Sequence, residues 1–106
     1  MKRGEMWWAD VPGSGRRPYL VLTRDPAIPL LTRLLAVPAT RTIRGLPTEV
    51  PLGREDGMSE ECVLSLDNVQ LLRKARFVTR ICRLSAPRMH AVCVALNRAT
   101  GCSTRA

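Results

Sequence analysis

Two polar side chains stand where apolar segments of this chain meet its loops. Arg17 precedes the apolar segment 18–23, and Thr40 closes the segment 34–39. Reacting and binding groups are concentrated at such junctions, because a rigid scaffold holds them at the edge of solvent. A guanidinium can hold a phosphate with two parallel hydrogen bonds, and a neighbouring hydroxyl can donate one more. We interpret Arg17 and Thr40 as a candidate pair for stabilising a phosphate during displacement; the alternative is two ordinary strand-end residues.

The charge balance of the chain favours a polyanionic partner. Lys and Arg together number 17 and Asp and Glu 9, which gives a formal net charge of +8. All of these cations except Lys2 and Lys74 are Arg, which forks onto phosphate oxygens where Lys acts as a point charge. A GC-rich genome would also enrich Arg over Lys, but it would not raise cations over anions. The excess positive charge therefore indicates nucleic acid or another polyanion as the partner.

The size and composition of the chain limit its architecture. A length of 106 residues, 45% of them apolar, predicts one domain over 1–106 with one modest core. No apolar run approaches the roughly 20 residues that a membrane-spanning helix needs, and no signal-peptide-like stretch follows the basic N-terminus. We therefore expect a cytoplasmic protein that has no membrane partner.

The cysteines do not have the spacing of a metal site. Cys62, Cys82, Cys93 and Cys102 form no C-x-x-C pair, and the single histidine, His90, cannot complete a zinc set. Cys82 falls in a predicted strand and Cys93 on the core face of a predicted helix, so we expect reduced cysteines in the core. We expect neither a metal ion nor a cofactor.

The order of apolar segments and turn residues predicts a mainly β fold that positions the Arg17/Thr40 pair. Aromatic, β-branched and alternating segments predict strands at 4–10, 19–23, 34–39, 48–52, 62–66, 69–72 and 77–84. The segments 11–16 and 41–47 are predicted to be basic loops flanking the pair, and 53–61 a solvated polar turn.

One helix is predicted at the C-terminal end. Ser85 is a suitable N-cap and Gly101 a suitable C-terminal stop. The apolar stripe of this helix is formed by Met89, Val92, Cys93 and Leu96. Short strands followed by a single helix are typical of a small, strongly curved antiparallel sheet or barrel that a helix caps.

Four blocks of the sequence, in order and spread over nearly the whole chain, resemble one protein family. They are residues 4–10 (GEMWWAD), 17–18 (RP), 37–40 (VPAT) and 67–70 (DNVQ). These blocks look like the successive blocks of the MazF/PemK-type toxins, the endoribonuclease halves of bacterial toxin–antitoxin pairs. The resemblance implies an SH3-like small barrel of the MazF/PemK/CcdB-like toxin fold, with a C-terminal helix.

The resemblance also implies an activity and partners. Members of this family act as homodimers that cut single-stranded RNA at short sequences without a metal, leaving a 2′,3′-cyclic phosphate and a 5′-hydroxyl. Arg17 and Thr40 match the family's catalytic Arg and Thr. A cognate antitoxin with an acidic, disordered tail would neutralise the chain by covering its basic groove.

Six further residues are predicted to contact RNA. They are Arg16, Arg41, Arg44, Asp67, Asn68 and Gln70. The three arginines lie on the loops that flank the candidate pair, where they would bind the RNA backbone or remain solvated. Asp67 and Asn68 match a polar pair that the family carries beside its site. Gln70 stands where many relatives have Arg or Lys, so we expect it to position RNA and not to react.

Two other functions stay open on the sequence alone. One is a CcdB-type toxin that binds a protein target, and the other is an SH3-like module that only binds nucleic acid. The Arg17/Thr40 pair favours the nuclease, because a binder needs no such pair. Trp7 and Trp8 would either stack on bases or lie in the core or a dimer interface.

Overall fold

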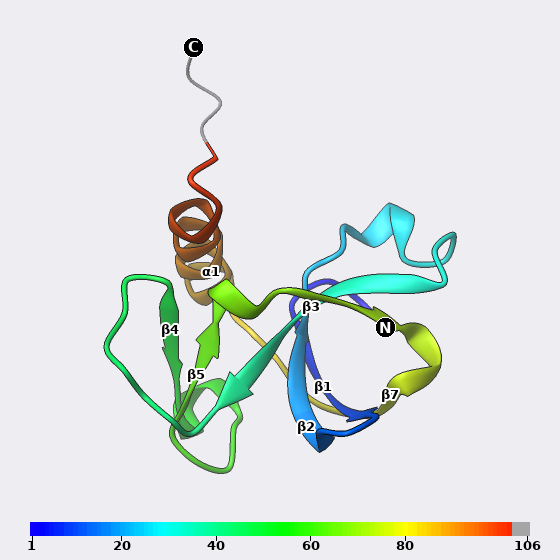
Figure 1. Cartoon of the computed structure of the whole chain (residues 1–106), viewed down its shortest axis with the longest axis horizontal. Helices are drawn as coiled ribbons and strands as arrows, with labels where there is room; N and C mark the ends of the chain where they lie inside the picture. The colour runs from blue at the N-terminus through cyan, green and yellow to red at the C-terminus, as the bar shows by residue number, and fades with distance from the viewer. Residues whose placement is uncertain (103–106) are drawn as a thin grey trace.

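The computed structural model describes residues 1–102 as a strongly curved antiparallel sheet that carries one long helix (Figure 1). The strands are β1 (Glu5–Val11), β2 (Gly15–Val21), β3 (Arg33–Thr40), β4 (Glu49–Leu52), β5 (Cys62–Ser65), β6 (Gln70–Arg73) and β7 (Phe77–Arg83). The helix, α1, spans Ala86–Thr100. The predicted fold class, mainly β with a terminal helix in a small barrel-like arrangement, is therefore confirmed.

Strand β3 is the centre of the sheet and determines where Thr40 lies. The strand order is β4-β5-β3-β2-β1-β7, and β6 also pairs with β3. On one edge β3 pairs with β2. On its other edge its first half pairs with β6, and its last residues, Ala39 and Thr40, pair with β5. The sheet divides at this point, so the side chain of Thr40 stands where two groups of strands separate.

The hairpin between β1 and β2 brings two arginines into the sheet. Val11 pairs with Gly15, and the turn between them contains Gly13 at φ +82. This left-handed backbone is accessible to glycine at little cost, which explains the tight turn. The prediction of a loop that runs through Arg16 is wrong, because Asp10 pairs with Arg16 and Ala9 with Arg17 across the hairpin. The pairing places both arginines at the end of a strand, where their backbone is fixed.

The alternation of side chains along the central strands builds two cores, one on each face of the sheet. Leu20 and Val37 belong to the core under α1, whereas Val21 and Ala36 belong to the core on the opposite face. All four are fully buried. Because successive strand residues face opposite sides, a strand buried on both faces reads as a continuous apolar run.

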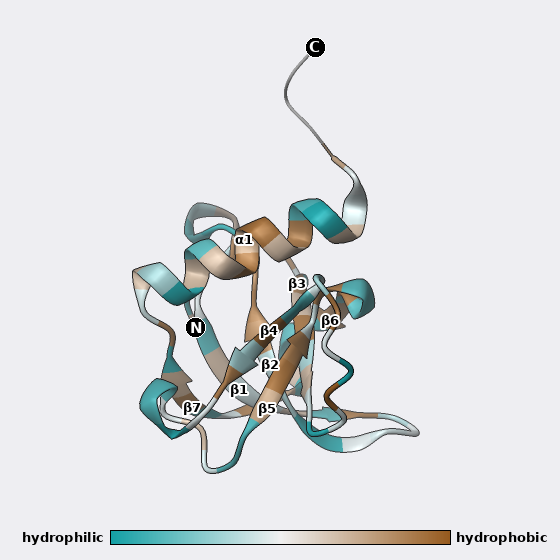
Figure 2. Cartoon of the chain, turned by 90° about the vertical axis from the view of Figure 1, so that its left-hand side faces the viewer, coloured by the Kyte–Doolittle hydropathy of each residue, from teal (hydrophilic) through white to brown (hydrophobic). Residues whose placement is uncertain are grey.

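Helix α1 closes one end of the sheet and has the predicted ends (Figure 2). The hydroxyl of Ser85 accepts a hydrogen bond from the backbone N–H of Arg88 at 3.3 Å, and Gly101 ends the helix at φ +63. The buried residues of the helix are Val92 and Ala95. Cys93 is exposed, so its predicted place in the core is wrong: the stripe that faces the sheet is rotated toward Ala95.

The segment between β4 and β5 is less solvated than its polar sequence predicts. Met58 is buried in the core under α1. The carboxylate of Asp56 accepts hydrogen bonds from the backbone N–H of Gly53 at 3.0 Å and from Nε of Arg88 at 3.0 Å. The expected solvated turn is therefore wrong for this part, which ties the base of the loop to the helix. No helix among residues 1–102 is long and apolar enough to cross a membrane.

Candidate active site

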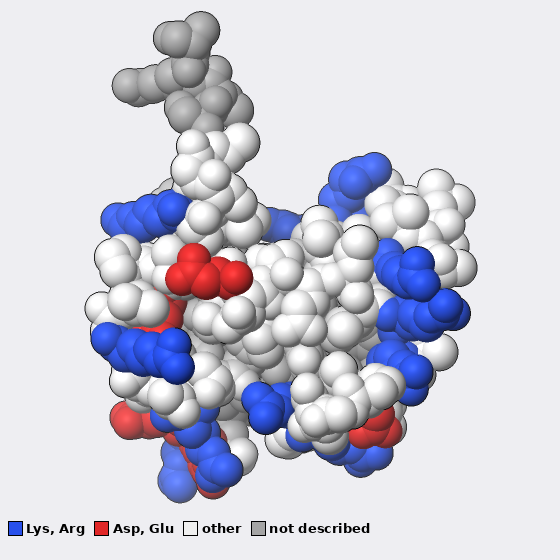
Figure 3. Space-filling model, viewed as in Figure 1, with Lys and Arg blue, Asp and Glu red and all other residues white. Residues whose placement is uncertain are grey.

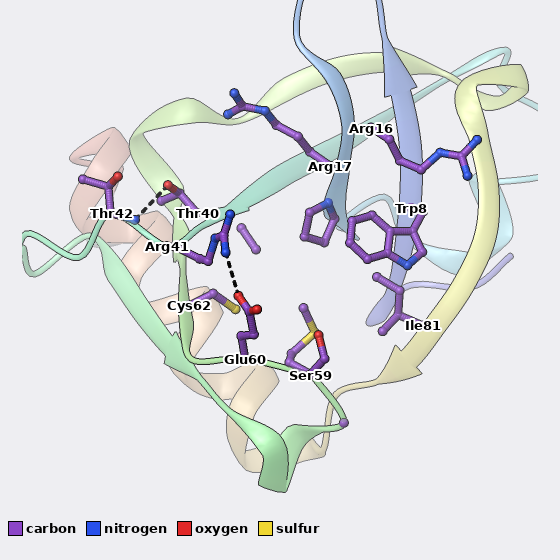
Figure 4. A pocket seen from close by; sticks show the side chains of 14 residues that line it. Trp8, Arg16, Arg17, Thr40, Arg41, Thr42, Ser59, Glu60, Cys62 and Ile81 are labelled. Atoms are coloured by element: carbon purple, nitrogen blue, oxygen red, sulfur yellow. Dashed lines mark hydrogen bonds and ion pairs between the residues drawn. The ribbon is translucent and has the colours of Figure 1, made fainter.

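A cleft of about 740 Å³ opens where the β1–β2 hairpin, the end of β3 and the β4–β5 loop meet (Figure 4). Both members of the candidate catalytic pair line it. The lining residues that the following paragraphs discuss are Trp8, Arg16, Arg17, Pro18, Thr40, Arg41, Thr42, Glu60, Cys62 and Ile81. The cleft therefore unites segments that are far apart in the sequence.

Arg17 offers an unneutralised guanidinium to this cleft. Its backbone is held in β2 opposite Ala9, and its side chain is exposed. Its Nε donates to the backbone carbonyl of Ser14 at 3.3 Å, and it has no ion pair with a carboxylate among the described residues. In Figure 4 the guanidinium extends toward the side of the cleft that carries Thr40 and Thr42. Its two terminal nitrogens are therefore available to a phosphate.

Thr40 is oriented by a hydrogen bond to the backbone. It is the last residue of β3, lies opposite Val63 and is half-buried. Its Oγ1 accepts the backbone N–H of Thr42 at 3.1 Å. Because the oxygen is engaged as an acceptor, the hydroxyl hydrogen stays free to donate into the cleft. The side chain is thus suited to donate to a phosphate oxygen.

The other two arginines of the cleft are held by carboxylates. Arg16 binds Asp10 through two hydrogen bonds, Nε–Oδ1 at 2.8 Å and Nη2–Oδ2 at 3.2 Å, and this contact lowers the pKa of the Asp10 carboxyl. Arg41 contacts Glu60, Nη1–Oε2, at 3.0 Å. All four side chains are largely exposed. Exposed ion pairs are weak, so a phosphate can replace either carboxylate at low cost.

The remaining predicted RNA contacts do not line the cleft. Arg44 is exposed in the segment between β3 and β4, and its backbone N–H donates to Glu49. Asp67 accepts the hydroxyl of Thr48 at 2.6 Å, and Asn68 donates to Ser65 at 3.1 Å.

Gln70 begins β6, where it pairs with Ala36. The short turn that contains Asp67 and Asn68 packs against α1. A role of these residues in RNA binding therefore stays a prediction that the cleft itself does not support.

The sequence does not predict that Glu60 and Ile81 line the cleft, and for Trp8 it leaves open base stacking or a place in the core or a dimer interface. Glu60 lies in the segment predicted to be a solvated turn, and no sequence signal indicates that this loop returns to the end of β3. Trp8 and Ile81 come from neighbouring strands and form an apolar part of the wall. Adjacent strand residues face opposite sides, so only one of the two tryptophans could enter the cleft.

Cys62 is part of the cleft lining but is not suited to act as a nucleophile. It is buried, and burial, with a smaller contribution from the charge of Asp56, raises the pKa of its thiol. A protonated thiol is a poor nucleophile. Within residues 1–102 there is no cluster of three His, Cys, Asp or Glu side chains that could hold a metal ion. Figure 3 shows basic side chains on both sides of the face viewed in Figure 1, with few acidic ones between them.

Fold and cleft together define a small, basic, mainly β protein in which an exposed guanidinium and an oriented hydroxyl line one cleft. The model of the PemK-like, MazF-like toxins of type II toxin–antitoxin systems matches residues 2–100. The chain therefore belongs to this toxin family, and the resemblance read from the four sequence blocks is confirmed.

Individual relatives agree with this family. The chain is 45% identical over 103 residues to the probable endoribonuclease MazF2 of Mycobacterium tuberculosis, covering 96% of this chain and 100% of that protein. It superposes on the Mycobacterium tuberculosis toxin MazF-mt6 with a TM-score of 0.87 at 32% identity, over 93% of this chain and 98% of the toxin. An endoribonuclease in complex with its cognate antitoxin, from a mycobacterial species, gives a TM-score of 0.88 at 25% identity and covers 99% of both chains.

Proposed function

We propose that this chain is the endoribonuclease toxin of a type II toxin–antitoxin pair, acting in the cytoplasm as one domain over residues 1–106. It cuts single-stranded RNA at short sequences. The observation that carries the proposal is the pairing, in one cleft, of a hydroxyl that is free to donate and a guanidinium that has no acidic partner within residues 1–102. The activity that the names of its relatives state agrees with this chemistry.

The reaction uses a nucleophile that RNA itself supplies. The 2′-oxygen attacks the adjacent phosphorus, the bond from phosphorus to the 5′-oxygen breaks, and the products are a 2′,3′-cyclic phosphate and a 5′-hydroxyl. The proton lost by the 2′-hydroxyl and the one gained by the 5′-oxygen are exchanged with water or a cleft side chain. No step in this scheme requires a metal ion or a cofactor.

Arg17 and Thr40 divide the task of stabilising the negative charge on the phosphate. The guanidinium of Arg17 donates to the non-bridging oxygens, where charge grows in the transition state. The hydroxyl of Thr40, on the side of the cleft toward which the guanidinium extends, donates a further hydrogen bond. Arg16 and Arg41 hold neighbouring phosphates of the bound strand after their carboxylate partners are displaced.

The partners follow from the charge and from the relatives. A chain of net charge +8 attracts both RNA and an acidic antitoxin tail, and the tail would inhibit by occupying the same cleft. One structural relative is an endoribonuclease described in complex with its cognate antitoxin. We propose the same kind of partner for this chain, and a homodimer as the active form.

The test is to incubate the purified, antitoxin-free chain with a mixed-sequence RNA in EDTA and to map the cut sites and end groups. Cuts at one short motif, with 2′,3′-cyclic phosphate and 5′-hydroxyl ends, are expected. RNA that stays intact in the presence of folded protein would refute the nuclease. In that case, retention of RNA by the protein would indicate a binding module, and no retention a toxin with a protein target.

A further inference from the structure

Two adjacent tryptophans of β1 have different environments. Trp7 is half-buried against the core on the face opposite α1, and its Nε1 donates to Oε1 of Glu5 at 3.1 Å. Trp8 is 36% exposed and lines the cleft. Within residues 1–102 the indole of Trp8 makes no hydrogen bond. Trp7 therefore has a structural role, whereas the exposed surface of Trp8 has no partner in the described chain.

The position of Trp8 is fixed by the sheet. Its strand is paired on both sides, and Trp8 lies opposite Pro18 of β2 and Thr79 of β7. A residue in an interior strand keeps its backbone position, so its side chain can act as a rigid surface. Figure 4 shows Trp8 and Ile81 on one side of the cleft and Thr40 and Arg41 on the other. An aromatic wall of this kind faces the same space as the phosphate-binding groups.

The wall that Trp8 and Pro18 form begins at the residue that directly follows Arg17 in the sequence. Pro18, the cross-strand partner of Trp8, directly follows Arg17 and also lines the cleft. In single-stranded RNA each base is attached close to the phosphate that follows it. Because Arg17, Pro18 and Trp8 line the same cleft, a strand whose phosphate is held by Arg17 can lay a neighbouring base against this wall.

We propose that Trp8 is the stacking platform for a base adjacent to the phosphate that Arg17 holds. This inference rests on the proposed function, because it assumes single-stranded RNA in the cleft. Every base has a π-face, so stacking on an indole contributes affinity and sets the register of the strand without selecting one base. Trp8 should therefore affect KM much more than kcat, and affect all cut sequences alike.

The first test compares Trp8→Leu with Trp8→Phe in cleavage of one short RNA, after circular dichroism shows that both variants are folded. Loss of a stacked base costs roughly 5- to 150-fold in affinity. Trp8→Leu should raise KM on this scale with kcat nearly unchanged, and Trp8→Phe, which keeps an aromatic face, should restore most of the loss. Trp7→Phe is the matched control and should leave KM unchanged. A Trp8→Leu variant with the KM of the wild type would overturn the proposal.

An abasic substitution in the RNA tests the contact from the other side. Removing the base next to the cut should weaken binding to the wild type by the same factor as Trp8→Leu. In Trp8→Leu the same abasic RNA should lose little more. Equal losses from base removal in the two proteins would show that the base does not touch Trp8. Should Trp8→Leu fail to fold, the same comparison is made in Trp8→Met, which also lacks an aromatic face.

Fluorescence separates failure of this inference from failure of the proposed function. In Trp7→Phe, Trp8 is the only tryptophan of the chain. Titration with a short RNA that carries 2′-deoxyribose at the cut site should quench its emission, and an abasic version should quench less. Quenching without cleavage of unmodified RNA would support the stacking and refute the nuclease. Binding without a change in Trp8 emission would refute the stacking whether or not the RNA is cut.

Discussion

The substitution Arg17→Ala separates the chemistry of the cleft from the stability of the fold. The only hydrogen bond of the Arg17 side chain among residues 1–102 is the 3.3 Å contact from Nε to the carbonyl of Ser14, at an exposed position. Its backbone pairing with Ala9 does not depend on the side chain. The free energy of unfolding should therefore change by no more than about 0.5 kcal/mol.

Activity should fall far more than stability. Among residues 1–102, Arg17 is the cleft arginine that has no ion pair with a carboxylate. Its guanidinium is therefore available to stabilise the negative charge that grows on the phosphate oxygens. Removing one such preorganised donor costs about 2.7–4 kcal/mol, or roughly 10²–10³ in kcat. Arg17→Lys keeps the positive charge but cannot donate two parallel hydrogen bonds to the phosphate. Its cleavage rate should remain about 10-fold or more below that of the wild type, because one hydrogen bond to a charged group is lost.

The assay is single-turnover cleavage of a short RNA with saturating protein, which measures the chemical step alone. Arg33→Ala is the matched control, since Arg33 is exposed on β3, carries the same charge and does not line the cleft. The control should keep the rate of the wild type. If Arg33→Ala were as slow as Arg17→Ala, net charge and not transition-state stabilisation would explain the loss, and the role given to Arg17 would be refuted.

Three further predictions concern charge, acid stability and the core. Glu60→Gln frees Arg41, so single-stranded RNA should bind more tightly, and the slope of log affinity against log salt concentration should become steeper by about 0.7. Glu61→Gln is the control, because Glu61 is exposed and lies outside the cleft lining, and it should leave this slope unchanged. Equal slopes in the two variants, measured by fluorescence anisotropy, would contradict the prediction. Burial raises the pKa of the Glu5 carboxyl, but hydrogen bonds from Lys2 and Trp7 and the charge of Arg80 outweigh it and lower the pKa overall. The stability that Glu5 contributes is therefore present above its unfolded-state pKa and lost as the pH falls through the folded-state pKa, so Glu5→Gln should show a smaller drop in melting temperature on acidification than the wild type, and an equal drop would speak against the contribution. Leu64 is fully buried, and Leu64→Ala should lower the free energy of unfolding by about 2–5 kcal/mol in urea denaturation; a loss below 1 kcal/mol, roughly, would mean that the core around it repacks.

Local signals account for the parts of the fold that the sequence predicts well. Helix α1 begins after Ser85 and ends at Gly101 as expected, because capping residues act within one turn of the helix. Proline within a strand is typical of an edge strand, and β4, which contains Pro51, lies at one end of the strand order.

Non-local pairing accounts for the errors. Arg16 lies in a strand and not in a loop because it pairs with Asp10, and the rotation that exposes Cys93 depends on which stripe of α1 meets the sheet. Neither contact is encoded within a short window of sequence.

The sequence predicts those site residues that lie where a strand meets a loop. Arg17 and Thr40 both follow from the junction of an apolar run with a loop, and the structure brings them into one cleft. Glu60 reaches the cleft only through the path of the β4–β5 loop, which a polar sequence does not specify. The environment of Trp8 depends on the twist and pairing of β1, since its sequence neighbour Trp7 has the same side chain and a different role.

Cleavage, in EDTA, of two RNAs that differ at a single sugar tests directly whether the 2′-hydroxyl is the attacking group. One carries ribose at the nucleotide on the 5′ side of the cut, and the other carries 2′-deoxyribose there. The first RNA should be cut to a 2′,3′-cyclic phosphate and a 5′-hydroxyl, whereas the second should stay intact at this position while it still binds. Cleavage of the deoxy-substituted RNA at the same bond would contradict this mechanism, because the attacking group would then not be the 2′-hydroxyl.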